Sequence, residues 1–184
     1  MSVDGISLSF MDRKTLRERF ITVPQEPVFL PAGSTVRENL DPLSLATTEQ
    51  CRDVLQAIGL SEMVEGAGGL DGVLYESALS QGQRQIFNLA RAVLKRKTAG
   101  GAVLLLDEFT SSVDLETEKN MLSIMDRAFA GCTIIMVAHR LHMVSEFCDR
   151  VLVMDRGTVV EDGNPRTLSK MDGTWYASLL AAMH

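Results

Sequence analysis

The sequence predicts an α/β fold built around a parallel sheet, and three of its features support that prediction. Five consecutive apolar residues, Ala102–Leu106, follow a Gly-Gly pair and run directly into Asp107 and Glu108. A second apolar run, Cys132–Ala138, ends immediately before His139. The stretch between the two runs has apolar residues at helical spacing. Uninterrupted apolar runs of this length are typical of strands that are buried on both faces of a parallel sheet.

Length and composition fit one globular domain, or a core with a small inserted lobe, because 184 residues are enough to bury a core. Hydrophobic residues make up 46% of the chain, which argues against extended disorder. The net charge of −6 gives no general attraction to nucleic acid or to anionic lipid. We therefore expect no nucleic-acid partner, and any phosphate site must be local.

The cysteines and the apolar runs indicate a domain of the soluble, intracellular type. The three cysteines are odd in number and lack C-x-x-C spacing, which favours a reducing compartment over a zinc site or a disulfide framework. The longest apolar run, Cys132–Ala138, is too short to span a bilayer. The first residues lack the basic and apolar regions of a signal peptide. We expect neither a signal peptide nor a transmembrane segment in this sequence.

The elements before residue 80 are predicted from turn signals and short periodic stretches. We expect β structure in 3–10, a short helix or turn in 13–19, a strand in 20–23 stopped by Pro24, a loop from Gln25 to Pro42, a helix from Thr47 closed by Gly59, and mostly loop in 63–76.

A longer helix is predicted to begin at Ser80. Ser80 and Gln83 have the spacing of a capping box, and apolar residues then recur at helical spacing at Ile86, Leu89, Ala90, Val93 and Leu94. The basic run 95–97 places positive charge at the negative end of the helix dipole. A helix N-terminus of this kind can bind phosphate, although these residues alone fit a well-capped helix without a ligand better.

The elements after the acidic pair complete the α/β pattern. We expect a polar turn in 110–114, a helix in 115–129 broken by Gly131, a strand in 132–138, a short helix in 141–147, a hairpin of 151–154 with 158–161, and helical structure in 165–184.

The acidic pair is the strongest candidate for chemistry. Asp107 and Glu108 follow a predicted strand, and open α/β sheets bind their ligands at the carboxyl ends of the strands. Two adjacent carboxylates there suit a divalent metal and a water nucleophile. These residues alone fit a strand that ends in a solvated acidic turn equally well. His139 is predicted at the same level of the sheet, which makes it a better candidate for polar chemistry than a lone histidine usually is.

The order of the motifs resembles that of the ATP-binding-cassette (ABC) ATPase family over nearly the whole chain. The motifs are Gln25, then Ser80-Gln81-Gly82-Gln83, then the apolar strand with Asp107 and Glu108, then Ser111–Asp114, then His139. Each motif is weak alone, and the five in this order make the resemblance strong. The stretches 23–27 and 36–42 look more narrowly like the C subfamily, the multidrug-resistance-associated type. Glu108 resembles the second nucleotide-binding domain of that subfamily, because the first commonly carries Asp there.

The resemblance implies a P-loop NTPase (RecA-like) ABC ATPase core with an inserted helical subdomain. In that family scheme residues of about 34–96 form the helical lobe with the signature helix. Residues 1–33 and 97–184 form parts of the ATPase core. The implied activity is ATP hydrolysis that drives export across a membrane, with ATP and Mg²⁺ as the cofactors.

The resemblance also implies a role for each matching residue. Asp107 would hold Mg²⁺, Glu108 would be the general base, and Gln25 would sense the metal, the γ-phosphate and the membrane subunit. His139 would bind the γ-phosphate, and Asp114 would couple two sites across a dimer.

The signature residues Ser80, Gln81, Gly82 and Gln83 would contact ATP that is held by a partner domain. Gln81 departs from the family's usual Gly-Gly pair, which fits the second domain of asymmetric C-type transporters.

One family motif is missing from this sequence. The chain contains no Gly-Lys dipeptide and therefore no G-x-x-x-x-G-K-[ST] loop. The family places that loop upstream of the segment that matches residues 3–5. The sequence thus resembles a cassette that lacks the N-terminal strand, the Walker A loop and its helix, and we expect a fragment that is inactive on its own, with one sheet edge open to association.

Three functions follow as hypotheses. The first is the ATPase domain of an ABC transporter, whose partners would be transmembrane domains and a second nucleotide-binding domain. Such a chain would lie at the cytoplasmic face of a membrane and contact it only through the transporter. The second is a non-catalytic interaction module that offers its signature motif to another cassette. The third is an ABC-type ATPase of chromosome maintenance, which the lack of an inserted coiled coil disfavours.

Overall fold

The computed structural model describes residues 2–110 and 113–182. The chain divides into two compact units, Met1–Val137 and Ala138–His184.

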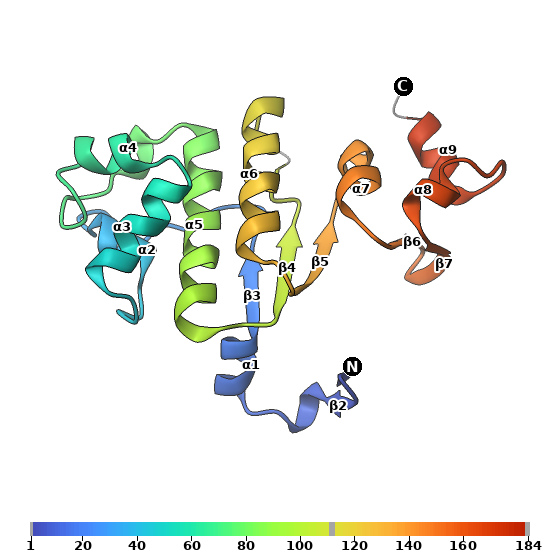
Figure 1. The fold of residues 1–184 in the computed structure, drawn as a ribbon, viewed down its shortest axis with the longest axis horizontal. Helices are drawn as coiled ribbons and strands as arrows, with labels where there is room; N and C mark the ends of the chain where they lie inside the picture. Colours follow the sequence, from blue (N-terminus) through green and yellow to red (C-terminus); the bar gives the residue numbers. More distant parts are fainter. Residues whose placement is uncertain (1, 111–112, 183–184) are drawn as a thin grey trace. The chain divides into compact units, whose positions relative to one another are not determined.

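The first unit is organised around a three-stranded parallel sheet. Its strands β3 (Phe20–Val23), β4 (Val103–Asp107) and β5 (Thr133–Val137) lie in the order β3-β4-β5. Both pairings are parallel, and the three arrows point the same way in Figure 1. The carboxyl ends of all three strands therefore meet at one edge of the sheet. The predicted α/β class and the predicted strands are confirmed.

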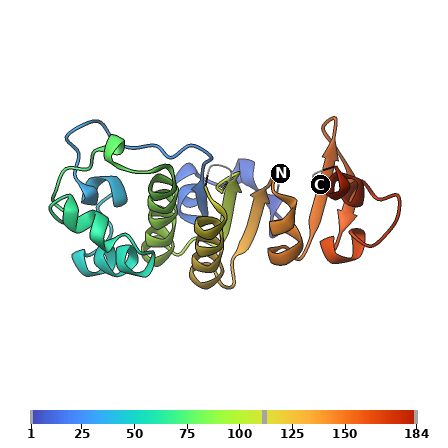
Figure 2. The same cartoon turned by 90° about the horizontal axis from the view of Figure 1, so that it is seen from above.

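Two long helices cover one face of this sheet. They are α5 (Gln81–Ala99) and α6 (Leu115–Ala128), and they lie side by side in both Figure 1 and Figure 2. Along β3 and β4 alternate side chains are buried, with Ile21 and Leu104 at 1% and 0% exposure. Alternation of this kind places every second side chain of a strand on the face that the helices cover.

The expectation that the second apolar run is buried on both faces was wrong. Ile135 and Val137 of β5 are each 55% exposed, and Ile134 is 37% exposed. The physical reason is the position of β5, which is the edge strand and pairs only with β4 among the strands that the structure describes. An apolar run therefore predicted the strand correctly but not how completely it is covered.

The Gly-Gly pair that separates α5 from β4 has two different functions. Gly100 has φ 78° and ends the helix in the left-handed conformation, which glycine adopts without a steric cost. Gly101 sits against β3, and a Cβ atom there would lie 2.8 Å from Cγ1 of Ile21. Only a residue without a side chain fits at that point.

Helices also make up most of the segment between β3 and α5. They are α2 (Val36–Leu40), α3 (Thr48–Ala57), α4 (Ser61–Gly66) and the 3₁₀ turn η2 (Glu76–Ala78), joined by one isolated antiparallel bridge between Thr35 and Val73. The helix α3 was predicted from the sequence, whereas α2 and most of α4 lie in stretches that were predicted as loop. The signal was present, because Thr35 and Glu38 form a capping box at the start of α2.

The N-terminal residues form small elements ahead of β3. They are β1 (Ser2–Val3), β2 (Ile6–Ser7), the 3₁₀ turn η1 (Leu8–Phe10) and α1 (Arg13–Arg19). Asp12 begins α1 as its N-cap and accepts hydrogen bonds from the backbone N–H groups of Lys14 and Thr15, each at 2.9 Å.

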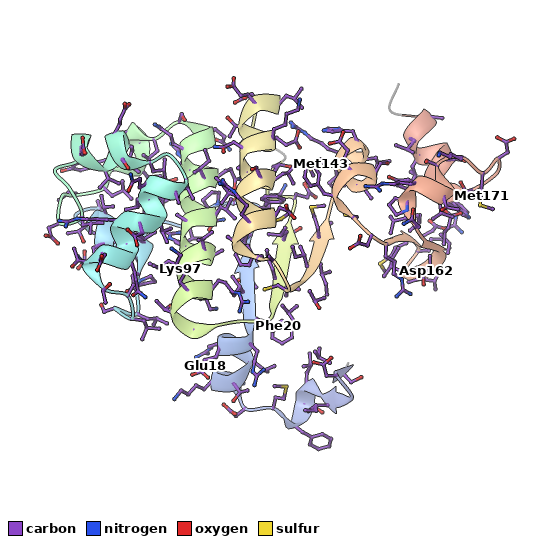
Figure 3. All side chains as sticks on the ribbon, in the orientation of Figure 1. Glu18, Phe20, Lys97, Met143, Asp162 and Met171 are labelled. Carbon is purple, nitrogen blue, oxygen red and sulfur yellow. The ribbon has the colours of Figure 1, made fainter. Side chains whose placement is uncertain are left out.

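In the second unit, the described residues 138–182 form a hairpin and three short helices. Its elements are α7 (Leu141–Phe147), β6 (Val151–Asp155), β7 (Thr158–Gly163), α8 (Pro165–Leu168) and α9 (Trp175–Ala181). Its core centres on Val144, Val153, Leu168 and Tyr176. An ion pair joins Arg150 to Asp162 of β7, which is labelled in Figure 3, and holds the pKa of that carboxyl below its ordinary value. In the part of the chain that the structure describes, every helix is too short or too polar to cross a bilayer.

Candidate functional site

Three predicted site residues meet at the carboxyl edge of the sheet. Asp107 is the last residue of β4 and is exposed, and Glu108 follows it in a half-buried position. Gln25 lies two residues beyond the end of β3. The parallel pairing of β3 with β4 brings these ends together, although Gln25 and Glu108 are 83 positions apart in the chain.

A hydrogen bond joins Gln25 directly to Glu108. Nε2 of Gln25 donates to Oε2 of Glu108 at 2.9 Å. The backbone N–H of Glu108 also donates to the carbonyl of Val137 at 3.1 Å, which ties the acidic turn to the end of β5. The carboxylate is therefore oriented from both neighbouring strands, and a charge-assisted bond of this kind is stronger than a neutral one.

The backbone of Glu108 is strained. Its φ is 44°, in the left-handed region that costs a residue with a side chain about 1–2 kcal/mol. Strain of this kind persists where the surrounding structure determines the conformation, and it concentrates at functional sites. Here the turn directs the Glu108 side chain to Gln25 while Asp107 remains in the strand.

The predicted capping box at the start of α5 is confirmed. Oγ of Ser80 accepts a hydrogen bond from the backbone N–H of Gln83 at 3.1 Å, and Oε1 of Gln83 accepts one from the N–H of Ser80 at 2.9 Å. Ser80 and Gln81 are exposed. Gly82 faces α6, because a Cβ atom at that position would lie 3.5 Å from Cγ2 of Thr117.

Asp114 is the N-cap of α6, and its cap contacts the start of α5 through Thr117. Its carboxylate accepts hydrogen bonds from the backbone N–H groups of Glu116 and Thr117 and from the Thr117 hydroxyl, at 3.0, 2.9 and 2.7 Å. The bonds from Thr117 lower the pKa of Asp114 below its ordinary value. Thr117 thus contacts both the Asp114 cap and the position of Gly82, which brings the starts of α5 and α6 together.

Two polar residues of α5 that the sequence analysis did not single out also reach this edge. Nε2 of Gln85 donates to the carbonyl of Gln25 at 2.7 Å, and Nδ2 of Asn88 donates to the carbonyl of Pro24 at 3.2 Å. Both side chains are buried. Their signal in the sequence was a polar pair at i, i+3 within the face that the apolar residues mark as buried.

Arg91 continues this contact between α5 and the loop after β3. Its guanidinium lies 5.0 Å from the ring centroid of Phe29 and 5.3 Å from that of Phe87, and it donates to the carbonyls of Val28 and Asn39. Burial lowers the pKa of Arg91 to about 10. The loop that carries Gln25 is therefore held along its length by one face of α5.

The structure places His139 two residues beyond β5, in the second unit. It follows the strand that pairs with β4, as the sequence predicted. Ser111 and Ser112, which belong to the fourth motif, lie outside the described residues.

The donor set fits Mg²⁺ better than a metal held by protein alone. Among the described residues, no group of three or more His, Cys, Asp or Glu side chains gathers at one point. Mg²⁺ is usually held by one or two carboxylates together with water and substrate phosphates. Asp107, an exposed carboxylate beside an oriented Glu108, provides ligands of that kind.

Comparison with known proteins identifies the family. The model of the family described as "ABC transporter" matches residues 1–111, more than half of the chain. The chain is 45% identical over 185 residues to ABC transporter FGM5 of Gibberella zeae and 44% identical over 190 residues to the ABC-type transporter braE of Annulohypoxylon truncatum. Each alignment covers 97% of this chain and 13% of the relative, so the chain spans about an eighth of their length.

A solved structure has the same fold. A bacterial Atm1-family ABC exporter with ATP bound matches with a TM-score of 0.85 and 27% sequence identity, over 99% of this chain and 31% of that one. The fold is thus the α/β fold of the P-loop ABC ATPases, as the sequence predicted. Together with the family match over residues 1–111, this shows that the chain belongs to the ABC transporter family.

Proposed function

We propose that this chain is the ATP-hydrolysing part of an ABC exporter, with its chemistry at the carboxyl edge of the β3-β4-β5 sheet. The observation that carries the proposal is the hydrogen bond from Gln25 to Glu108 beside the exposed Asp107. This bond orients the Glu108 carboxylate next to Asp107, a candidate metal ligand. Phosphoryl transfer to water needs an arrangement of this kind.

Glu108 is the proposed general base. Its carboxylate accepts a proton from the attacking water as the water oxygen bonds to the γ-phosphorus of ATP. The bond from that phosphorus to the bridging oxygen breaks, and its electron pair leaves with ADP. Asp107 would hold Mg²⁺, which supplies charge stabilisation to the phosphate oxygens when it is bound. Gln25 keeps the Glu108 carboxylate oriented and is placed to sense whether metal and phosphate are present.

The starts of α5 and α6 are the proposed contact surface for a second nucleotide-binding domain. Ser80, Gln81, Gly82 and Gln83 form a helix N-terminus in which Ser80 and Gln81 are exposed, and its partial positive charge suits a phosphate of ATP held by the partner. Asp114, which approaches them through Thr117, would couple the two sites. His139 is proposed to bind the γ-phosphate because it matches the family's histidine in order along the chain.

The proposal extends to the subfamily and to the other partners. The motifs around Gln25 and Asn39, with Glu108 in the acidic pair, favour the second nucleotide-binding domain of a C-type transporter. Gln81 in the signature favours an asymmetric pair of sites. The region of about 34–96 is the proposed helical lobe, and its four helical elements ahead of α5 support that assignment. Transmembrane domains are the remaining partners, and the chain would meet the membrane through them at its cytoplasmic face.

The test follows from a motif that this sequence does not contain. Because it has no Gly-Lys dipeptide, its residues do not include the loop that grips the phosphates of ATP. We expect the 184-residue chain to hydrolyse ATP negligibly. Fusing a family phosphate-loop segment ahead of Ser2 should produce Mg²⁺-dependent phosphate release, measured in a coupled assay.

Two matched variants make the test specific. In the fused form Glu108→Gln should lower turnover by about 10²–10⁴-fold, the usual contribution of a general base. Glu49→Gln makes the same change at an exposed carboxylate in the first turn of α3 and should leave turnover unchanged. Equal turnover with and without the phosphate loop, or equal turnover of the two variants, would contradict the proposal.

A further inference from the structure

The Gln85 side chain is buried in a way that packing does not explain. It is 1% exposed, and its Oε1 atom has no hydrogen-bond partner among the residues that the structure describes. A buried polar atom without a partner costs free energy, whereas a methionine of similar length would fill the same space without that cost. The amide is therefore expected to contribute something other than core volume.

The Nε2 atom of the Gln85 amide indicates the role of this side chain. Nε2 of Gln85 donates to the carbonyl of Gln25 at 2.7 Å. Gln25 as a whole is exposed, whereas its bond to Gln85 is partly buried. The bond satisfies the buried Nε2 group of Gln85, and it also fixes the backbone from which the Gln25 side chain reaches Glu108.

We propose that Gln85 is a positioning residue that holds Gln25 in the conformation in which it orients Glu108. This inference rests on the proposed function, because it assigns Gln85 a role through Gln25 and Glu108. Gln85 acts from the second turn of α5, while Gln25 makes the contact with the carboxylate.

The energetic reason lies in conformational entropy. A glutamine side chain on an exposed loop has several rotatable bonds, and ordering it opposes the formation of a single hydrogen bond. Anchoring its backbone to a long helix removes part of that freedom before the side-chain bond forms. Loss of the Gln85 donor should therefore lower the fraction of molecules in which Gln25 is bonded to Glu108.

The experiment observes the side-chain amide of Gln25 in the 184-residue chain by ¹⁵N–¹H NMR. Gln25→Ala assigns the signal by removing it, and Glu108→Ala gives its position without the carboxylate acceptor. Gln85→Met should move the Gln25 signal at least halfway from the wild-type position to the Glu108→Ala position. Gln85→Leu provides a second apolar replacement and should give the same displacement.

A matched control separates positioning from general helix packing. Nζ of Lys95, on the same helix, donates to the carbonyl of Phe20 at 3.0 Å, at the other end of β3. It lies about 15 Å along α5 from Gln85. Lys95→Met also removes a partly buried donor from a β3 carbonyl, but it should leave the Gln25 signal at its wild-type position. Phe20, at the start of β3, is labelled in Figure 3.

The melting temperature distinguishes the proposal from a purely structural role. Gln85→Met should keep or raise the melting temperature, because it removes an unpaired buried oxygen while the signal is still displaced. An unmoved Gln25 signal in both Gln85 variants, or an equal displacement in Lys95→Met, would overturn the proposal. So would a Gln25 signal that Glu108→Ala leaves unchanged. The measurement needs no ATP, so its outcome is independent of whether the fused form hydrolyses ATP.

Discussion

At the scale of single residues, Glu108 combines a strained backbone with an oriented side chain. Its left-handed φ of 44° places the residue just outside β4. The bond from Gln25 then fixes its carboxylate. Stability and proposed function make opposite demands at this position, as they often do at active sites.

Glu108→Gly should raise the stability of the chain. Glycine adopts a positive φ without the steric cost, so we expect the free energy of unfolding to rise by about 1 kcal/mol, measured by urea denaturation. Arg156, with φ 45° in the hairpin turn of the second unit, is a matched control. Arg156→Gly should give a similar gain. A loss of stability in Glu108→Gly alone would mean that the side-chain bond to Gln25 outweighs the backbone strain.

At the scale of elements, the starts of the helices determine much of the candidate site. The capping box of α5 makes its N-terminus rigid, and the Asp114 cap does the same for α6. Both caps use local hydrogen bonds, which is why Ser80 and Gln83 were recognised as a cap from the sequence. The two starts lie close together at Gly82, where a Cβ atom would be in ordinary van der Waals contact with Thr117.

The Asp114 cap should make stability depend on pH. Its folded-state pKa is lowered, so the ionised cap stabilises the protein above the ordinary carboxyl pKa, and this contribution is lost as the pH falls through the folded-state pKa. Asp114→Ala should lower the melting temperature at about pH 7, and the gap from wild type should shrink toward about pH 2.

Asp12 offers a comparison for that measurement. It caps α1 with the same bonds, to two backbone N–H groups and a threonine hydroxyl, and its pKa is also lowered, first by the bond from Thr15. The difference in melting temperature between Asp12→Ala and the wild type should likewise shrink as the pH falls. A gap in Asp114→Ala that stays constant down to the acid limit would show that the cap does not depend on the charge of Asp114.

At the scale of the whole molecule, we expect the exposed strand β5 to promote association between chains. Ile134, Ile135 and Val137 are apolar and exposed on an edge strand, and such strands template association between chains. Ile135→Thr should raise the monomer fraction in analytical ultracentrifugation, with little change in stability because Ile135 is already half exposed.

A loop residue provides the control for this prediction. Val28 is 70% exposed on the loop after β3, where no strand edge is available. Val28→Thr also replaces exposed apolar surface with a hydroxyl group but should leave the monomer fraction unchanged. If both substitutions raised the monomer fraction equally, exposed apolar area rather than the strand edge would be the cause of association.

The local elements were largely predictable because their signals are local. Apolar runs marked β4 and β5, helical spacing with a capping box marked α5, and turn residues marked the hairpin of the second unit. The α2 helix was missed because its four-residue cap signal is short and lies in a stretch with several prolines. The burial of β5 was overestimated because an apolar run does not reveal what covers it.

The sequence alone determined the order of the five motifs, the two acids at the end of β4 and the type of most strands and helices, though not that of α2. Only the tertiary structure decided that Gln25 bonds to Glu108 and that Gln85 holds Gln25 from α5. Both contacts join residues 60 or more positions apart, and they exist because parallel pairing aligns the ends of β3 and β4 under one face of α5. Spacing along a chain encodes a helix cap or a strand, but contacts between distant segments depend on how the whole sheet and its helices pack.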